Sequence, residues 1–492
     1  MIDDAILTIE KENLPQGWQL KTIPQLVGKD GVFVDGDWVE SKDQDPDGEV
    51  RLIQLADIGD GQYRNKSQRF LTLRKAKELG CTFLKEGDVL IARMPGPLGR
   101  ACIFPGDAKD AVTVVDVAIA RPGKDEFDTK WLMHFVNAPA FRKAVASMEA
   151  GSTRKRISRK NLGKILLPLP PLPQQRPIAA EIDMQFSRLD EAATALKRIQ
   201  ANLKRYKAAV LKTAVEGKLT EKWRKEHPDV EPADQLLKRI LAERRANWEA
   251  EELAKMKAKG IKPKDDMWKK KYKEPAGPDT ANLPQLPEGW VWASVEQLGD
   301  VFGGLTKNPK RASLPLQLPY LRVANVYANE LRLDEIEQIG IEERELAKLL
   351  VLTGDLLIVE GNGSPEQIGR VAIWEGSIEP CVHQNHLIKI RLSPACLPKW
   401  TLYWLLSANG RNYIREVSSS TSGLYTLSTG KVGGLPVPLP SLTEQQQIAD
   451  EIDRRLSVSE DLEVTIETNL KRAERLRQTT LQRAFYGRGS IT

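Results

Sequence analysis

The chain repeats itself, and this repeat constrains its fold more than any other feature of its 492 residues. Six segments of the first half recur in the same order in the second half, each displaced by 267 to 272 residues. A single match could arise by chance, but six in the same order could not. We therefore interpret the chain as two copies of one structural unit, spanning roughly residues 14–220 and 286–490. The matched pairs are Leu14–Trp18 with Leu286–Trp290, Gly87–Ile91 with Gly354–Ile358, Gly99–Arg100 with Gly369–Arg370, Leu167–Pro170 with Val437–Pro440, Ile178–Asp183 with Ile448–Asp453, and Leu211–Lys218 with Leu481–Arg488.

Each copy has the pattern of an α/β domain. Short runs rich in Val, Ile and Leu, bounded by Gly, Pro and Asp, are typical of strands. These runs are Val50–Ile58, Asp88–Ala92 and Val112–Ala120 in the first copy, and Tyr320–Val326, Asp355–Val359 and His386–Leu392 in the second. We expect one helix near Trp131–Val145 and its counterpart near Trp400–Val417. A proline-rich segment closes each domain, at Leu166–Pro173 and Leu435–Pro440, and should be extended because proline fixes φ and donates no hydrogen bond.

A long helix is predicted after each proline-rich segment. Apolar or small residues recur every seventh position, and such a heptad stripe favours a coiled coil. The stripes are Ile182, Leu189, Leu196, Leu203 and Val210 in the first copy, and Ile452, Ser459, Ile466, Ala473 and Thr480 in the second. We expect the two helices to pack together. The alternative is two separate amphipathic helices, each covering its own domain.

A charged segment, residues 221–282, joins the two copies. Its stretch Leu236–Ala258 combines strong helix formers with interleaved charges, which predicts an exposed helical arm. The following stretch, Lys262–Lys273, is very basic and contains Trp268 and Tyr272. We interpret it as a solvated linker. Nucleic-acid binding through the lysines and the aromatic rings is the alternative.

Composition and missing motifs narrow the class of protein. A formal charge of +6 and a pI of about 8.9 permit a nucleic-acid partner without requiring one. The sequence contains neither a phosphate-binding loop nor an Asn-Pro-Pro-[Tyr/Phe] methyltransferase motif, so we expect no catalysis by this chain. The spacing of Cys381, His383, His386 and Cys396 matches no standard zinc finger, so we expect no metal.

The sequence also indicates a compartment. Its four cysteines lie in mostly apolar surroundings, which indicates buried free thiols in a reducing environment. The N-terminus lacks the basic and then apolar pattern of a signal peptide, and no apolar run approaches the ~20 residues that span a bilayer. We expect a cytoplasmic protein without a membrane partner.

The junctions between domains and helices resemble a known family. Leu167–Arg176 followed by Ile178, and Leu439–Gln447, resemble the proline-rich entry to the shared helices of type I restriction-modification specificity subunits. Leu211–Leu219 resembles the motif that ends those helices, and Leu481–Arg488 is a looser copy. The openings at Leu14 and Leu286 and the segment Gly87–Arg93 are also similar, so the resemblance covers nearly the whole chain.

This resemblance implies a fold of class α+β: two similar α/β target recognition domains joined by two long helices that form an antiparallel coiled coil. The boundaries that it implies are a first target recognition domain at 1–173, a central conserved helix at 174–220, a charged helical arm at 221–282, a second target recognition domain at 283–440, and a C-terminal conserved helix at 441–492.

The resemblance also implies a function and partners. The family reads double-stranded DNA at a split site, one half-site per domain, and has no catalytic role of its own. Two modification subunits carry S-adenosylmethionine and methylate adenine N6. Two restriction subunits that use ATP and Mg can join them, and this chain itself holds no cofactor.

Base and phosphate contacts require Arg, Lys, Asn, Gln, Ser and Thr side chains, and we expect them in two loops of each copy. One loop follows the Gly-Asp strand and the other precedes the proline-rich segment. The expected DNA-binding residues of the first copy are Arg93, Arg100, Ser152, Thr153, Arg154, Lys155, Arg156 and Lys160. Those of the second copy are Asn362, Ser364, Gln367, Arg370, Ser420, Thr421, Tyr425 and Lys431.

Two other functions fit part of this pattern. A scaffold that assembles proteins without binding DNA would also use two domains and a coiled coil. A specificity protein of another phage-defence system would use the same domains with different partners. The donor-rich loops at matching positions favour DNA recognition.

Overall fold

In a computed structural model of the chain, residues 6–7, 14–94, 96–124, 127–151, 155–263, 265–421 and 423–486 are described. They fold into two units, and each unit takes helical segments from both halves of the sequence. The first unit consists of residues 1–198 with 465–492, and the second of residues 199–464. The division falls within the two long helices, α6 (Leu172–Val215) and α14 (Leu442–Tyr486).

Three small sheets make up the first unit. The largest has the order β3-β9-β6-β7 with antiparallel neighbours. The second has the order β5-β4-β8, in which β4 and β8 are parallel, and the third has the order β1-β10-β2. The strands are β1 Ile6–Leu7, β2 Gln19–Thr22, β3 Val32–Asp35, β4 Val50–Ile53, β5 Phe70–Leu71, β6 Val89–Ala92, β7 Ala101–Ile103, β8 Ala111–Thr113, β9 Val117–Arg121 and β10 Ile165–Leu169.

The second unit repeats this topology. Its four-stranded sheet has the order β12-β21-β17-β19, its mixed three-stranded sheet β16-β13-β20, and its two-stranded sheet β11-β24. Two further small sheets, β14-β15 and β18-β23-β22, lie in its loops. The strands are β11 Val291–Ser294, β12 Gly299–Gly303, β13 Leu316–Leu321, β14 Val326–Tyr327, β15 Glu330–Leu331, β16 Glu337–Ile341, β17 Leu356–Val359, β18 Gly361–Asn362, β19 Val371–Ile373, β20 Val382–His383, β21 Leu387–Leu392, β22 Ser419–Thr421, β23 Leu424–Thr426 and β24 Pro436–Leu439.

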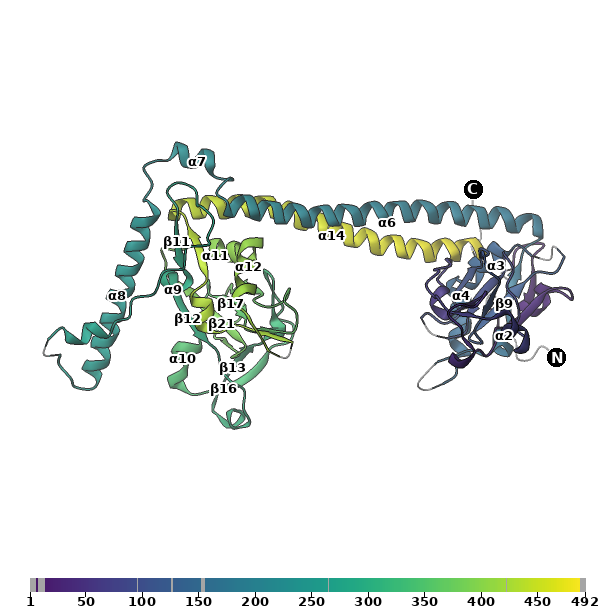
Figure 1. The fold of residues 1–492 in the computed structure, drawn as a ribbon, viewed down its shortest axis with the longest axis horizontal. Helices are drawn as coiled ribbons and strands as arrows, with labels where there is room; N and C mark the ends of the chain where they lie inside the picture. The colour runs from purple at the N-terminus through teal and green to yellow at the C-terminus, as the bar shows by residue number, and fades with distance from the viewer. Residues whose placement is uncertain are drawn as a thin grey trace. The chain divides into compact units, whose positions relative to one another are not determined.

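The shorter helices also correspond between the units. In the first unit they are α1 Ile23–Val27, α2 Leu73–Glu78, α3 Thr129–Val136, α4 Pro139–Ser147 and α5 Arg159–Leu162. In the second they are α9 Val295–Leu298, α10 Glu343–Leu349, α11 Pro398–Leu406, α12 Ala408–Val417 and α13 Thr429–Gly433. The α/β fold predicted for each copy is confirmed, and Figure 1 shows helices beside the sheets within each unit.

Some expected elements were wrong in extent. The single helix expected near Trp131–Val145 is two helices, because the residue before Pro139 adopts an extended conformation and the proline opens a new helix. Its counterpart is likewise divided, at Ser407. The run Val112–Ala120 contributes to two different sheets, as β8 and β9. The proline-rich segments are extended as expected over Leu166–Leu169 and Pro436–Leu439, where they pair antiparallel with β2 and β11. The expectation was wrong for Leu172 and Pro173, which form the start of α6.

The predicted coiled coil is confirmed, and its helices are antiparallel (Figure 1). In the first unit Gln185 contacts Thr480 while Asp190 contacts Arg477, so residue numbers rise along α6 as they fall along α14. In the second unit the Lys207 ammonium lies 2.7 Å from the Glu463 carboxylate. Leu462 and Leu476 of α14 are exposed and lie outside the seam between the two helices.

Each long helix also completes the core of the unit that contains its C-terminal end. Phe485, near the end of α14, is buried in the first unit and packs 5.1 Å from the Phe135 ring. Val210 and Ala214, near the end of α6, are buried in the core of the second unit. Each long helix therefore packs into the unit at its far end, which argues against two separate amphipathic helices that each cover only their own domain.

The joining segment forms α7 (Glu221–Glu226) and α8 (Ala233–Ala258). The expectation of a fully exposed arm was wrong for the start of α8, where Leu236 and Ile240 are buried in the core of the second unit. None of the helices in the described part of the chain combines the length and apolarity needed to cross a membrane.

Candidate nucleic-acid interface

The structure brings together the two loops predicted for the second copy. Asn362 in β18 pairs with Tyr425 in β23, and Tyr425 pairs in turn with Ser420 in β22. With Thr421, which is also in β22, four of the predicted residues therefore lie in one small sheet. Sequence spacing could not show this pairing, because the loops are more than 50 residues apart.

The first unit joins its two loops at one equivalent point. The backbone N–H of Ile157 donates to the Arg93 carbonyl at 3.1 Å, as the N–H of Leu427 donates to the Glu360 carbonyl at 2.8 Å in the second unit. A bridge between Ala150 and Arg156 closes the base of the second loop. Ser152, Thr153 and Arg154 lie outside the described residues.

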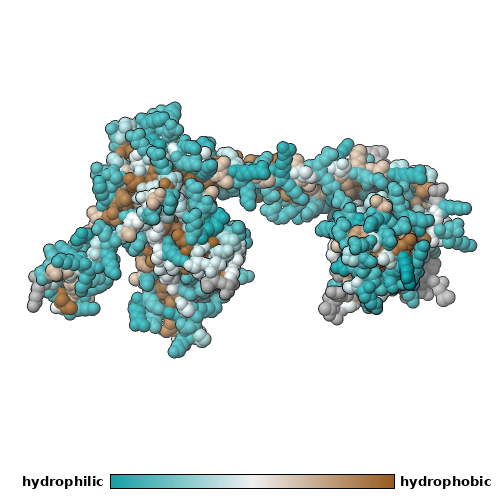
Figure 2. Space-filling view, in the orientation of Figure 1, coloured by the Kyte–Doolittle hydropathy of each residue, from teal (hydrophilic) through white to brown (hydrophobic). Residues whose placement is uncertain are grey.

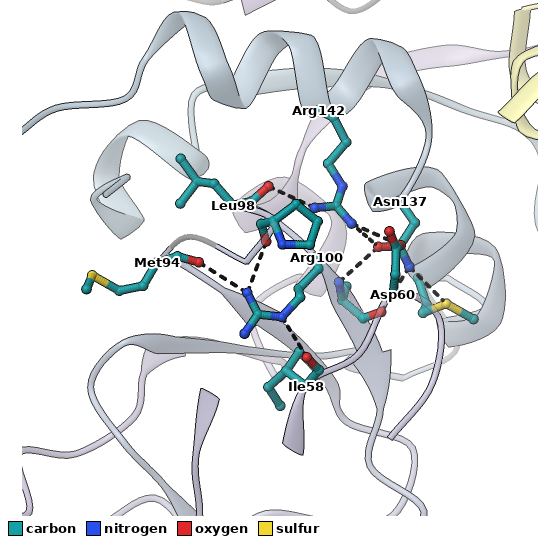
Figure 3. Close-up of polar contacts among 10 residues, drawn as sticks. Ile58, Asp60, Met94, Leu98, Arg100, Asn137 and Arg142 are labelled. Carbon is teal, nitrogen blue, oxygen red and sulfur yellow. Dashed lines mark hydrogen bonds and ion pairs between the residues drawn. The ribbon is translucent and has the colours of Figure 1, made fainter. Parts of the chain in front are cut away.

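Arg100 holds the loops of the first unit from within (Figure 3). Its side chain is 5% exposed, and its Nε donates to the Ile58 carbonyl at 2.6 Å. Its remaining nitrogens donate to other backbone carbonyls, among them that of Leu55 at 2.7 Å. Burial lowers the pKa of this guanidinium. Arg100 therefore positions the loop backbone.

A second arginine, Arg142 of α4, completes this arrangement (Figure 3). It donates to the Leu98 carbonyl at 2.8 Å, to the Asn137 side-chain oxygen at 2.7 Å and to the Asp60 carboxylate at 3.0 Å. The loop after β6 is thus tied both to α4 and to the segment after β4. Sequence analysis missed Arg142, although an arginine recurs 269 residues later as Arg411.

The same pair of arginines recurs in the second unit. Arg370 donates to the Val323 carbonyl at 3.3 Å, at the position that corresponds to Leu55. Arg411 donates to the Gly369 carbonyl at 2.8 Å. The repeated Gly-Arg pairs are therefore explained by loop positioning, and the Arg370 guanidinium also lies 4.8 Å from the centre of the Tyr327 ring.

Arg93 is also engaged with its own chain. Its Nε lies 3.0 Å from the Asp35 carboxylate, and its Nη atoms donate to the carbonyls of Ile157 and Val115. The second unit has Glu360 at the corresponding position, where it pairs with His386 at 3.0 Å. The two copies therefore carry opposite charges at one point of a shared framework.

Other predicted residues present their side chains to solvent. Lys155, Arg156 and Lys160 are exposed in the first unit, as are Gln367 and Ser420 in the second. Lys155 pairs with Glu149 at 2.5 Å.

Other residues predicted in the second unit are partly buried, namely Asn362, Ser364, Arg370, Tyr425 and Lys431. In the first of its two loops, Asn362 accepts from the backbone N–H of Ser364 at 3.0 Å, and the Ser364 hydroxyl donates to Glu366 at 2.9 Å. In the second, Lys431 donates to the Ser419 hydroxyl, and only the backbone of Thr421 is described.

A third loop of the first unit escaped the sequence analysis. It follows β4 and exposes Arg64, Lys66 and Arg69. Its Gly61 N–H donates to the Ala101 carbonyl at 2.9 Å, so it lies against the strand that begins after Arg100. The run Arg-Asn-Lys-Ser-Gln-Arg at residues 64–69 was the available signal.

The motifs that carried the family resemblance are structural joints. The Trp18 indole N–H donates to Gln174 at 3.1 Å, and the Trp290 indole N–H donates to Glu444 at 2.9 Å, so each opening tryptophan contacts the first turn of a long helix. The buried Gln175 donates to the Pro170 carbonyl at 2.9 Å and fixes that turn on the strand before it.

The aspartates of the repeated Ile-Ala-x-Glu-Ile-Asp segment join each long helix to its domain. Asp183 lies 2.7 Å from both His134 and Lys130 of α3, and these contacts lower its pKa to about 2, the His134 hydrogen bond being the largest cause. Asp453 accepts from Tyr403 and pairs with Lys399 at 2.6 Å in the second unit.

The cysteines and histidines considered as a zinc site in the second copy have separate surroundings and contacts. Cys381 and Cys396 are buried, and desolvation raises the pKa of Cys381 to about 12 and that of Cys396 to about 11. His383 is buried with Nδ1 3.1 Å from the Leu387 carbonyl, and burial lowers its pKa to about 4. Such groups are structural, and all four cysteines are buried free thiols as expected.

Comparison with known proteins identifies similar chains. A family model described as the type I restriction modification DNA specificity domain matches residues 287–472. The specificity subunit of the type I restriction enzyme EcoKI from Escherichia coli K12 is 26% identical over 76% of this chain and 68% of that protein. The StySPI specificity subunit from Salmonella potsdam is 23% identical over 74% of this chain and 65% of that protein.

A solved structure is similar over nearly the whole chain. It comes from work on complex assembly and conformational transition of the type I R-M system, and one of its chains matches with a TM-score of 0.65. The match covers 96% of this chain and 99% of that one at 15% identity, so it concerns the fold.

Proposed function

This chain belongs to the family of type I restriction-modification specificity subunits, and we propose that it reads a bipartite DNA site and directs adenine-N6 methylation and restriction by partner subunits. Its target recognition domains are residues 1–173 and 283–440. The helices at 174–220 and 441–492 join them, and 221–282 is an arm.

One observation supports this proposal most directly. The arginines that hold the loops recur in both units, whereas the exposed side chains on those loops differ. Arg100 with Arg142, and Arg370 with Arg411, fasten corresponding loops by bonds to backbone carbonyls. The exposed residues then differ, with cations in the first unit and mainly neutral donors in the second. A reader of two different half-sites requires this combination, whereas a symmetric scaffold does not.

The DNA contacts follow from exposure. We assign phosphate contacts to Lys155, Arg156 and Lys160 together with the preceding residues 152–154, because cations near phosphates supply most non-specific affinity. In the second domain the base-reading candidates are the exposed Gln367 and Ser420 together with Tyr425, which pairs with Ser420 across the small sheet. Asn362, Ser364, Thr421 and Lys431 lie beside them. Arg93, Arg100 and Arg370 position these loops.

The chemistry belongs to the partners. Two modification subunits supply S-adenosylmethionine and transfer its methyl group, and two restriction subunits supply ATP hydrolysis with Mg. Apolar side chains exposed on the long helices offer these subunits docking positions within each unit: Met184 and Leu476 in the first, and Ile199, Tyr206, Val458, Leu462 and Val464 in the second. We place the assembly in the cytoplasm, where its DNA is accessible.

The deciding experiment co-expresses the chain with its modification subunit and maps N6-methyladenine across the host genome. A split motif with a fixed gap supports the proposal and names both half-sites. A stable complex that leaves the genome unmethylated contradicts it and favours a scaffold or a specificity protein of another phage-defence system.

A matched pair of variants then tests the two interfaces. Arg156→Gln with Lys160→Gln should lower the slope of log affinity against log salt by up to about 2, since each phosphate contact contributes about 0.9. Ser420→Ala with Tyr425→Phe should weaken discrimination at one half-site and leave the salt slope unchanged. Equal salt slopes for the first variant and the parent would remove that loop from the interface.

A further inference from the structure

The net positive charge at the end of the arm exceeds the net charge of the whole chain. Between Leu253 and Lys273 stand nine lysines and two aspartates, whereas the formal charge of all 492 residues is +6. We call residues 253–263 and 265–273 the arm tip. Earlier in α8, from Ala233 to Glu252, acidic and basic residues are nearly balanced, so the charge is concentrated at one end.

The arm tip is folded. The chain returns along α8, and the buried Trp268 stacks on Trp248 with 6.1 Å between ring centroids. Tyr272 lies 5.4 Å from the same Trp248 ring, and the Arg245 guanidinium lies 5.8 Å from the centre of the Tyr272 ring. These rings therefore pack against α8 within the arm. This packing argues against the alternative that they stack on nucleic acid.

This packing leaves the ammonium groups outside. Lys257, Lys259, Lys262, Lys270, Lys271 and Lys273 are all exposed. Lys255 and Lys269 have carboxylate partners, Glu252 at 2.8 Å and Asp266 at 3.3 Å. In Figure 2 hydrophilic residues cover most of the arm, with a small hydrophobic area near its end.

The arm tip also stands apart from the core of its unit. Ile240 is buried in that core, and Arg244 pairs with Asp300 at 2.9 Å. Beyond Arg244, the side chains of Arg245, Trp248 and Glu249 contact the returning segment at Tyr272, Trp268 and Lys269. The 14 residues of α8 that follow Arg244, up to Ala258, extend about 21 Å at ~1.5 Å per residue.

We propose that the arm tip binds the phosphate backbone of duplex DNA outside the recognition site, without reading sequence. Its cations are all lysines, which act as point charges, whereas the planar fork of arginine favours base edges and fixed bidentate geometry. Flexible, exposed lysines suit contacts that must tolerate any flanking sequence. The inference rests on the proposed function, to which it adds a second and non-specific DNA surface.

The test uses the full chain in complex with its modification subunit. Lys270→Gln, Lys271→Gln and Lys273→Gln are combined in one variant. The control combines Lys222→Gln, Lys225→Gln and Lys238→Gln, which remove the same charge from lysines paired with carboxylates near the base of the arm. Affinity for a duplex without the recognition site is measured at several salt concentrations.

The arm-tip variant should lose about eightfold in affinity at 0.1 M salt for each phosphate contact removed, and its salt slope should fall by about 0.9 per contact. The methylated sequence should stay the same, because no base contact is lost. The control should match the parent in all three measurements.

Two results would overturn the inference. One is an arm-tip variant whose slope of log DNA affinity against log salt equals that of the control. The other is an arm-tip variant that loses the modification subunit but keeps the parent's salt slope for DNA binding, which would assign the surface to a protein partner. Either leaves the proposed function standing, provided the parent complex methylates a split site. A parent complex that binds no DNA would refute the proposed function itself.

Discussion

Replacing Glu444 with glutamine should open the joint at which the second domain meets its long helix. Glu444 is 2% exposed and accepts four hydrogen bonds: one from the Thr220 hydroxyl at 2.7 Å, two from Arg224 at 3.0 and 2.8 Å, and one from the Trp290 indole at 2.9 Å. An amide has one acceptor oxygen, so its NH2 group must face either the indole N–H or the guanidinium.

The cost follows from these contacts. A buried donor left unsatisfied costs about 1–3 kcal/mol, and breaking a buried ion pair from one side costs about 3–5 kcal/mol. The Arg224 side chain is 20% exposed and keeps its bond to the Gly217 carbonyl, which favours the lower end of that range. We expect Glu444→Gln to lower the local free energy of opening by about 3 kcal/mol.

Amide hydrogen exchange of the full chain measures this opening. A loss of about 3 kcal/mol corresponds to roughly 100-fold faster exchange in peptides covering residues 215–226 and 440–450. Gln174→Glu is the matched control, because Gln174 occupies the corresponding position, is exposed and accepts a hydrogen bond from Trp18. Exchange less than threefold faster in Glu444→Gln, or equally faster in the control, would refute the reasoning.

Three further changes test other joints. Asp183→Asn should lower the free energy of unfolding by roughly 1 kcal/mol, after allowance for solvent screening at a partly exposed site. Hydrogen bonding from His134 lowers the pKa of Asp183 in the folded state to about 2, so this contribution is complete above pH 4 and lost as the pH falls toward 2. Thermal unfolding of parent and variant between pH 2 and 7 would detect the difference. Gly217→Ala should cost about 1 kcal/mol or more beyond the cost of Gly260→Ala. The two glycines have similar φ values, +66° and +69°, but of the two only Gly217 would place a Cβ against a neighbour, at 2.5 Å; equal midpoints of thermal unfolding would contradict this. Arg100→Lys should cost about 2 kcal/mol in thermal unfolding without DNA, because lysine cannot reproduce the guanidinium's fork of bonds; a residue that only contacts DNA would leave that unfolding unchanged.

The duplication made most of the fold predictable. Heptad spacing identified the two long helices, and the matched segments identified two α/β units of similar plan. The misses lie where local sequence leaves the outcome open. Val112–Ala120 is one apolar run, yet a turn after Thr113 sends its two ends into different sheets, and only tertiary pairing decides that division. Strand β10 itself was also hidden, because a proline-rich run is extended whether or not it pairs.

The candidate site was predictable in position and less so in role. The choice of loops rested on donor-rich sequence, and the structure brings those loops together in each unit. Arg100 and Arg93 were chosen for their charge, yet their hydrogen bonds go to carbonyls and a carboxylate of their own chain. Charge alone cannot distinguish a cation that faces a phosphate from one that faces a backbone carbonyl, because both need the same donor.

This use of backbone acceptors has a consequence for how specificity can vary. Arg100, Arg142, Arg370 and Arg411 hold carbonyl oxygens, which every residue provides whatever its side chain. Loop conformation is thereby set independently of the exposed residues, so one copy can carry cations where the other carries hydroxyls at little cost in stability. Exposed positions away from such joints change stability by roughly 0.5 kcal/mol or less on substitution, whereas the four arginines should not tolerate it. Exchanging exposed loop residues between the copies should therefore alter DNA binding while leaving thermal unfolding nearly unchanged.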